Sequence, residues 1–168
     1  ARLAYSLASP ANDVSLADIA RLSDVFYIGG TKCGTLFGEA VVIPDGGSIR
    51  RFVTQMKQHG ALLAKGRLLG VQFEALFEDD LYLTLGAPGV AATKRIREAL
   101  IRAGYVVTMD SPTNLAFVAL DQAGHERLSR KVQYGIWETL PDGRLLARFC
   151  TSWGTPEEDI KAFEAALA

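Results

Sequence analysis

One stretch decides how the chain is interpreted: FYIGGTKCGTLFGEAVVI, residues 26–43. It begins with β-branched and aromatic residues, breaks at Gly29-Gly30, and resumes as a second apolar run. Such runs, bounded by glycine and proline, predict two short strands at 24–28 and 39–43. Because their hydrophobicity is continuous rather than alternating, we expect both faces of each strand to be covered, as in a layered α/β sheet.

Lys32 is the residue in this stretch that could carry chemistry. It lies between glycine pairs after the first strand, beside Thr31, and glycines allow a bound group to approach the backbone closely. We expect the strand to hold the lysine in a sheltered place, where desolvation favours the neutral amine and allows it to form an imine with an aldehyde. The alternative is an exposed loop lysine, which is the commoner case. The order of residues excludes a phosphate-binding P-loop.

Composition favours one or two compact domains. The chain has 168 residues, 49% of them hydrophobic and 22% charged, which excludes disorder and a coiled coil. Its 18 basic and 19 acidic side chains give a net charge of −1, so no broad positive field would attract nucleic acid. Cys33 and Cys150 have neither disulfide-framework nor metal-ligand spacing, so we predict no metal and a reducing, cytoplasmic compartment. No apolar run approaches the ~20 residues of a membrane span, so we expect a soluble protein.

Helices are predicted in the first hundred residues. Ser15 before an apolar stripe predicts an N-cap and a helix at 16–22. Two further helices are expected between 48 and 77. Another helix is expected from about 81 to 103. It would end before Gly104, and this glycine would adopt a left-handed conformation.

The pattern changes after residue 104. Four strands are expected, with a helix between the second and third and a last helix that starts at Thr155-Pro156 with an N-cap and a proline in its first position. The strands are predicted at 105–109, 115–120, 133–140 and 144–150. We therefore predict the end of a larger α/β domain at 1–80, a connecting helix at 81–103, and a small α+β domain at 104–168.

Three segments resemble one enzyme family. Residues 29–42 closely resemble the cofactor-lysine segment of the low-specificity threonine aldolases, pyridoxal-phosphate enzymes of fold type I in the aromatic amino acid β-eliminating lyase group. Ala1-Arg2-Leu3-Ala4 is similar to the close of that family's Asp-Gly-Ala-Arg motif, and LARFCTSW, residues 146–153, is similar to the small-domain segment with an active-site arginine. The resemblance covers the whole chain. It implies an α/β fold: the C-terminal part of the large fold type I domain, followed by a small α+β domain.

The resemblance implies roles for five residues. Lys32 would bind pyridoxal phosphate as an imine, from which the incoming amino acid displaces it. Arg2 and Arg148 would bind the substrate carboxylate in a site between domains. Thr31 would hydrogen-bond the cofactor phosphate or satisfy its own turn, and Lys65 loosely matches a basic residue that reaches the phosphate across a subunit interface. Without the resemblance, Arg2 would be a solvated charge and Arg148 would equally well be a structural ion-pair partner.

The implied activity is cleavage of L-threonine or L-allo-threonine to glycine and an aldehyde by a homodimer or homotetramer. The family's cofactor-binding aspartate, stacking histidine and glycine-rich turn would all precede Ala1, so the resemblance implies a missing N-terminal half, in the same or another polypeptide. A related β-eliminating lyase, an aminotransferase and a non-catalytic assembly fragment of such an enzyme are the alternatives.

Overall fold

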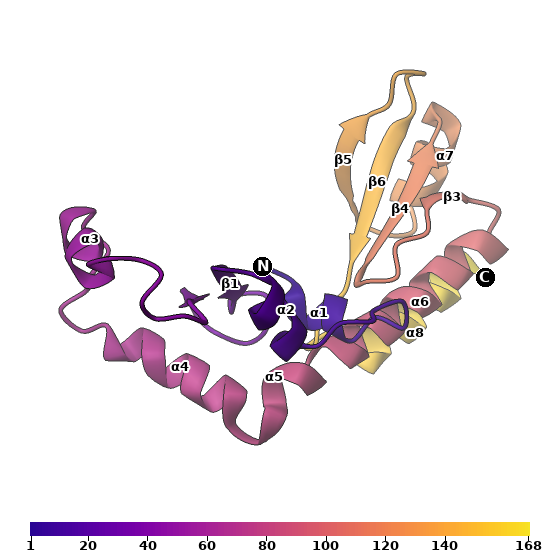
Figure 1. The fold of residues 1–168 in the computed structure, drawn as a ribbon. Coiled ribbons are helices and arrows are strands. Elements are labelled where there is room, and N and C mark those ends of the chain that lie inside the picture. Colours follow the sequence, from indigo (N-terminus) through magenta and orange to yellow (C-terminus); the bar gives the residue numbers. More distant parts are fainter.

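The computed structural model describes residues 1–168, and Figure 1 shows them in two groups of elements joined through a long helix, α6. The first group contains α1 (Leu3–Leu7), α2 (Leu16–Leu22), β1 (Phe26–Gly29), β2 (Glu39–Val42), α3 (Phe52–Gln58), α4 (Arg67–Phe77), the short 3₁₀ helix η1 (Glu78–Asp80) and α5 (Leu81–Thr84). The second contains α6 (Gly86–Arg102), β3 (Val106–Met109), β4 (Leu115–Leu120), α7 (Gln122–Ser129), β5 (Gly135–Thr139), β6 (Leu145–Cys150) and α8 (Glu157–Leu167).

β1 and β2 form a two-stranded antiparallel ribbon in which Ile28 lies opposite Ala40. One face of the ribbon packs on the helices of the first group, whereas the other is open, with Tyr27 64% and Val41 54% exposed. The expectation that both faces of these strands are covered is therefore wrong for this structure. Continuous hydrophobicity makes both faces apolar, but within these 168 residues helices cover only one of them.

A first buried cluster lies where α1 meets β1, α4 and α5. Its members are Ala4, Tyr5, Ile28, Cys33, Leu76 and Tyr82. A Cβ atom at Gly86 would collide with the carbonyl oxygen of Ala4, so glycine at this position allows α1 to lie directly against α6. Asp79 and Asp80 both have a left-handed backbone, with φ of 49° and 57°, at the sharp bend between α4 and α5 (Figure 1).

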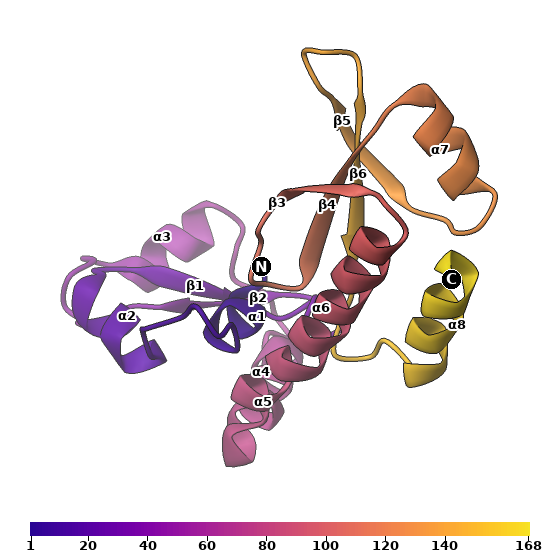
Figure 2. The same cartoon turned by 90° about the vertical axis from the view of Figure 1, so that its right-hand side faces the viewer.

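β3 to β6 form a four-stranded antiparallel sheet in the order β3-β4-β6-β5. Its central pair, β4 and β6, runs from Leu115 opposite Cys150 to Leu120 opposite Leu145. Helices α6, α7 and α8 pack against one face of this sheet (Figure 2). The core between them consists of Ile96, Ala99, Leu100, Ala116, Val118, Leu120, Leu128, Ala147, Phe149, Ile160 and Leu167. The strands predicted after residue 104 are thus confirmed as a small α+β unit.

The helix predictions are confirmed with two corrections. The Ser15 side chain caps α2, and Gly104 is left-handed with φ of 83°, both as expected. The helix predicted at 81–103 is divided after Thr84, whose hydroxyl donates to the Leu81 carbonyl oxygen. Pro156 is the N-cap of α8 rather than its first residue, because its ψ of 147° is extended.

Helix α6 belongs to both groups of elements. Its first residue, Gly86, lies against α1, and its later residues Ile96 and Leu100 lie in the core of the second group. The domain boundaries near 80 and 104 stay a prediction. None of the helices combines the length and the apolar character that crossing a bilayer demands.

Candidate active site

The turn after β1 fixes the backbone of Lys32. The amides of Cys33 and Thr35 both donate to the Gly30 carbonyl oxygen, at 2.7 and 3.2 Å. Gly30 has no room for a side chain, because a Cβ atom there would collide with Thr35 and with the Phe73 ring. Glycine at this position thus allows close packing of the chain's own side chains, whereas the expected approach of a bound group stays a prediction.

The side chain of Lys32 is exposed. The expectation of a sheltered lysine is therefore wrong for this structure. The physical reason is local: the turn buries Cys33 completely and leaves the side chains of Thr31 and Lys32 before it in solvent. Burial raises the pKa of the Cys33 thiol, so this cysteine stays protonated and is a packing residue, as predicted from the sequence.

Tyr5 connects the lysine turn to the end of β6. Its side chain is completely buried in the first cluster. The Tyr5 hydroxyl donates to the Lys32 carbonyl oxygen at 2.6 Å and accepts from the Trp153 amide at 3.3 Å. The three segments that resemble the aldolase family are thus brought together around α1 (Figure 2).

Arg2 lies directly before α1 and reaches the second group of elements. Its Nη2 donates to the Cys150 Sγ at 3.5 Å, and its Nε is buried without a hydrogen-bond partner. Asn114, which is 1% exposed, approaches the same sulfur with its Nδ2 at 3.7 Å and donates to the Thr151 carbonyl oxygen at 2.6 Å. Arg2 is therefore half-buried and held at the end of β6 rather than fully solvated.

Arg148 lies two residues before Cys150 on β6, so both side chains project from the same face of the strand. Its guanidinium carbon lies 4.7 Å from the centre of the Trp137 ring, a cation–π contact from the adjacent strand β5. Neither Arg148 nor Arg2 forms an ion pair with an acidic side chain. One face of the sheet therefore carries both Arg148 and Cys150, and Arg2 contacts this face at Cys150.

The remaining predicted residues lie apart from this contact. Thr31 is exposed, and its hydroxyl makes no hydrogen bond within the chain. Lys65 is exposed in the turn before α4, and no contact joins it to Lys32 or the arginines. Helix α4 reaches the lysine loop farther along, where the Leu36 amide donates to the Gln72 Oε1 at 2.8 Å.

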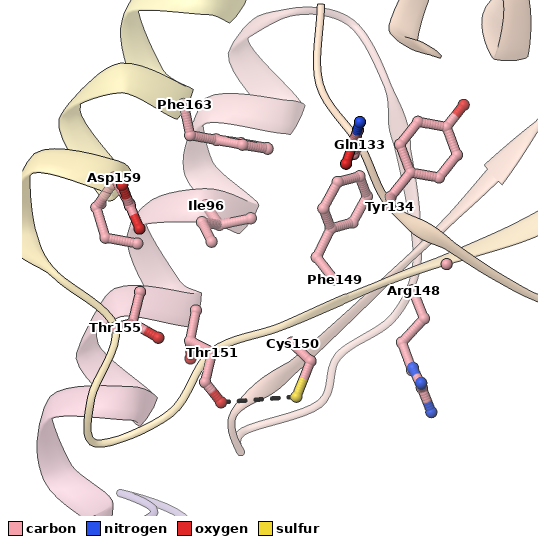
Figure 3. A pocket seen from close by; sticks show the side chains of 12 residues that line it. Ile96, Gln133, Tyr134, Arg148, Phe149, Cys150, Thr151, Thr155, Asp159 and Phe163 are labelled. Carbon is pink, nitrogen blue, oxygen red and sulfur yellow. Dashed lines mark hydrogen bonds between the residues drawn. The ribbon is translucent and has the colours of Figure 1, made fainter.

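A cavity of about 370 Å³ lies between β5, β6, α6 and α8, on the other side of the sheet. Its wall includes the apolar residues Ile96, Phe149 and Phe163, whereas the Arg148 side chain points away from it (Figure 3). Arg148 and Cys150 of β6 also contribute to its wall, whereas Lys32 and Arg2 do not line it. The cavity therefore borders the strand that carries Arg148 but does not contain the lysine turn.

Sequence reasoning missed three polar residues of this region: Tyr5, Asn114 and Thr35. The Thr35 hydroxyl is buried without a partner, beside the lysine turn. The one available signal was that Tyr5 lies between Leu3, Ala4 and Leu7, where a buried polar group requires a hydrogen-bond partner; Asn114 follows the polar run 110–113 and carried no such signal.

Comparison with known proteins gives consistent matches. No protein-family model matches the chain. The low specificity L-threonine aldolase of Pseudomonas aeruginosa is 27% identical over 139 residues, which cover 82% of this chain and 39% of that protein. The enzyme of the same name from a Pseudomonas species is 26% identical over 145 residues, covering 86% of this chain and 41% of that protein.

A solved structure of Leishmania major threonine aldolase superposes with a TM-score of 0.90 and 41% identity, covering 99% of this chain and 49% of that one. The chain thus spans less than half the length of each of these relatives. By sequence and by structure the chain is similar to the threonine aldolases across most of its length, and its mixed α/β fold is that of part of a pyridoxal-phosphate fold type I enzyme.

Proposed function

We propose that the protein containing this chain is a pyridoxal-phosphate-dependent lyase that cleaves L-threonine or L-allo-threonine to glycine and an aldehyde. The observation that carries the proposal is the meeting of the Lys32 turn, Arg2 and the end of β6 around α1. These segments are far apart in the sequence, and each carries a residue type that the reaction requires: one primary amine and two guanidinium groups. The 41% identity to the Leishmania major enzyme supports the same activity.

The residues present fit an aldehyde cofactor and an amino acid. Lys32 offers an accessible primary amine on a fixed backbone, through which it would hold the cofactor covalently. When bound, pyridoxal phosphate supplies a ring that accepts the electron pair released as the Cα–Cβ bond breaks. The unpartnered Nε of Arg2 is a buried donor that an anionic oxygen would satisfy.

The two arginines would hold the substrate carboxylate and thereby orient the scissile bond. A guanidinium group presents parallel N–H donors that match the two oxygens of a carboxylate. The Cys150 contact holds Arg2 on one side, and the stack on Trp137 holds the plane of Arg148 while leaving the edge of its fork free to donate. Both groups are free of competing acidic side chains.

We further propose that Thr31 and Lys65 reach the cofactor phosphate. The Thr31 hydroxyl is exposed, directly precedes Lys32 and is not used by its own turn, which supports a ligand role. Lys65 is exposed and distant from the lysine turn in sequence, which is compatible with a contact to the site of a second subunit.

The test uses the full-length protein with pyridoxal phosphate. Borohydride reduction followed by peptide mapping should place the cofactor on Lys32, and the Lys32→Ala variant should lose both the label and aldol cleavage. Glycine plus an aldehyde identifies the aldolase, ammonia plus a keto acid an eliminating lyase, and dependence on a keto-acid acceptor an aminotransferase. A label on another lysine, or cleavage that survives in Lys32→Ala, would contradict the assignment.

We also propose a cytoplasmic homodimer or homotetramer in which exposed apolar side chains of the first group are covered. Leu36 is 86%, Leu22 75% and Tyr27 64% exposed, which is unusual for such residues unless another surface packs on them. Both cysteines are free, as in a reducing compartment. The same exposure favours the second candidate, a non-catalytic assembly fragment, which predicts subunit association without any uptake of pyridoxal phosphate; light scattering and cofactor absorbance separate the two.

A further inference from the structure

We propose that Tyr5 is a positioning residue that sets the place of the Lys32 turn relative to the arginine-bearing strand β6. The inference rests on the proposed function of Lys32. It follows from one buried hydroxyl that contacts both the lysine turn and the loop after β6.

The Tyr5 ring has no freedom to move away from this junction. It is 0% exposed, and a Cβ atom at Gly89 would lie 2.8 Å from its Cε1 atom. Gly86, one helical turn earlier, gives α1 the same close contact with α6. Two glycines on one face of α6 therefore form the surface on which α1 and its tyrosine rest.

Both hydrogen-bonding functions of the hydroxyl are used. The O–H donates to the Lys32 carbonyl oxygen at 2.6 Å, and the oxygen accepts from the Trp153 amide at 3.3 Å. Removing the oxygen atom would leave one carbonyl and one amide without this partner in a largely buried place, where unpaired peptide groups are unfavourable. Burial also raises the pKa of Tyr5, so the hydroxyl keeps its proton through the neutral range.

The β6 side of the junction is itself firmly anchored. The Thr151 hydroxyl donates to the Gly89 carbonyl oxygen at 2.5 Å and lies 2.7 Å from the Thr93 hydroxyl, which ties the end of β6 to α6. No residue of the lysine turn hydrogen-bonds the second group of elements directly, although the turn packs with α1 in the first buried cluster. The hydrogen-bonded connection from the lysine turn to the loop after β6 therefore passes through the Tyr5 hydroxyl.

Tyr5→Phe in the full-length, cofactor-loaded protein tests the proposal, with Tyr105→Phe as the matched control because Tyr105 packs against the second core, away from the lysine turn. We expect kcat to fall at least about tenfold in Tyr5→Phe, because a small misplacement of a reacting group lowers the rate steeply, while KM changes less than about threefold. By hydrogen exchange, the Trp153 amide should exchange at least about tenfold faster, and the Cys33 and Thr35 amides should also lose protection.

Three results would overturn the proposal: a wild-type kcat in Tyr5→Phe, unchanged exchange at Trp153, or an equal effect of Tyr105→Phe. If Tyr5→Phe fails to fold, exchange in the wild-type protein decides. The Trp153 amide should be protected relative to that of Gly46 in an exposed turn, and equal rates would refute the contact. Borohydride labelling of Lys32 in the wild-type protein reports separately on the proposed function, so failure of the one is distinguishable from failure of the other.

Discussion

Replacing Arg2 with Gln tests the arrangement of the candidate site most directly. The change removes the positive charge but keeps a polar side chain of similar reach. In the structure Arg2 is half-buried, contacts Cys150 with one nitrogen and leaves Nε buried and unpaired. If a substrate carboxylate satisfies that donor, the variant loses a charged hydrogen bond that is only partly screened by water.

The size of the effect follows from this burial. Truncating one partner of a buried charged pair costs about 2–5 kcal/mol, and a half-buried guanidinium falls toward the lower end, about 2–3 kcal/mol. Since 1.4 kcal/mol corresponds to a factor of ten, the affinity for the amino acid should fall about 30- to 150-fold. A contact made equally in the ground state and the transition state raises KM and leaves kcat little changed.

The assay is steady-state aldol cleavage by the full-length, cofactor-loaded protein, together with a titration with glycine followed by cofactor absorbance. Arg21→Gln is the control, because Arg21 is an exposed arginine on α2 that pairs only with Asp18. A KM for Arg2→Gln within threefold of wild type, or an equal rise in Arg21→Gln, would refute the reasoning.

Three further changes have defined outcomes. Trp137→Ala removes the ring under the guanidinium of Arg148, and we expect KM to rise by up to about tenfold, measured by the same assay. Leu100→Ala empties a fully buried position of the second core and should lower the free energy of unfolding by about 2–5 kcal/mol, measured by urea denaturation. Arg95→Gln should lower Tm at neutral pH, and by progressively less as the pH falls below the ordinary pKa of a glutamate, about 4.3, because a hydrogen bond from Arg95 lowers the pKa of Glu164. This stabilisation is fully present above the pKa that Glu164 has in the unfolded chain, and it is lost as the pH falls through the lower pKa of Glu164 in the folded protein. Melting curves recorded at several pH values would show this loss.

The second group of elements could be predicted almost completely from the sequence. Its strands are separated by strong turn signals such as Pro141-Asp142-Gly143, where Gly143 has a φ of 85°. Its central strands are apolar, and the structure buries one face of the sheet against α6, α7 and α8. Local pattern and tertiary packing therefore agree, because the helices that cover these strands lie within residues 86–168.

The first group could be predicted only in part and element by element, because α1 and η1 were not expected. The two strands, α2 with its Ser15 cap and the two later helices were all expected, but their packing was not. The apolar run of β1 indicates that a second covering layer is favourable, yet it carries no information about which segment supplies that layer. The exposed Tyr27 and Val41 are the result.

For the site, the sequence identified the reactive residue types but not the contacts that assemble them. Arg2 and Cys150 are 148 residues apart, and so are Tyr5 and Trp153. No periodicity connects such positions, so only tertiary structure could show that one tyrosine hydroxyl joins the lysine turn to β6. The resemblance to threonine aldolases singled out Lys32, Arg2 and Arg148, but it gave no role to Tyr5.

The structure treats the backbone and the side chain of Lys32 in opposite ways. Its carbonyl oxygen is bound by a buried hydroxyl and its neighbour Cys33 is fully buried, whereas its own side chain reaches solvent. A lysine that exchanges its bond to a cofactor for one between the cofactor and an amino acid requires both conditions, since the backbone must stay while the amine moves. The exposed side chain of Lys32 contradicts the expected shelter, so a desolvated amine at this position would require covering groups that these 168 residues do not supply.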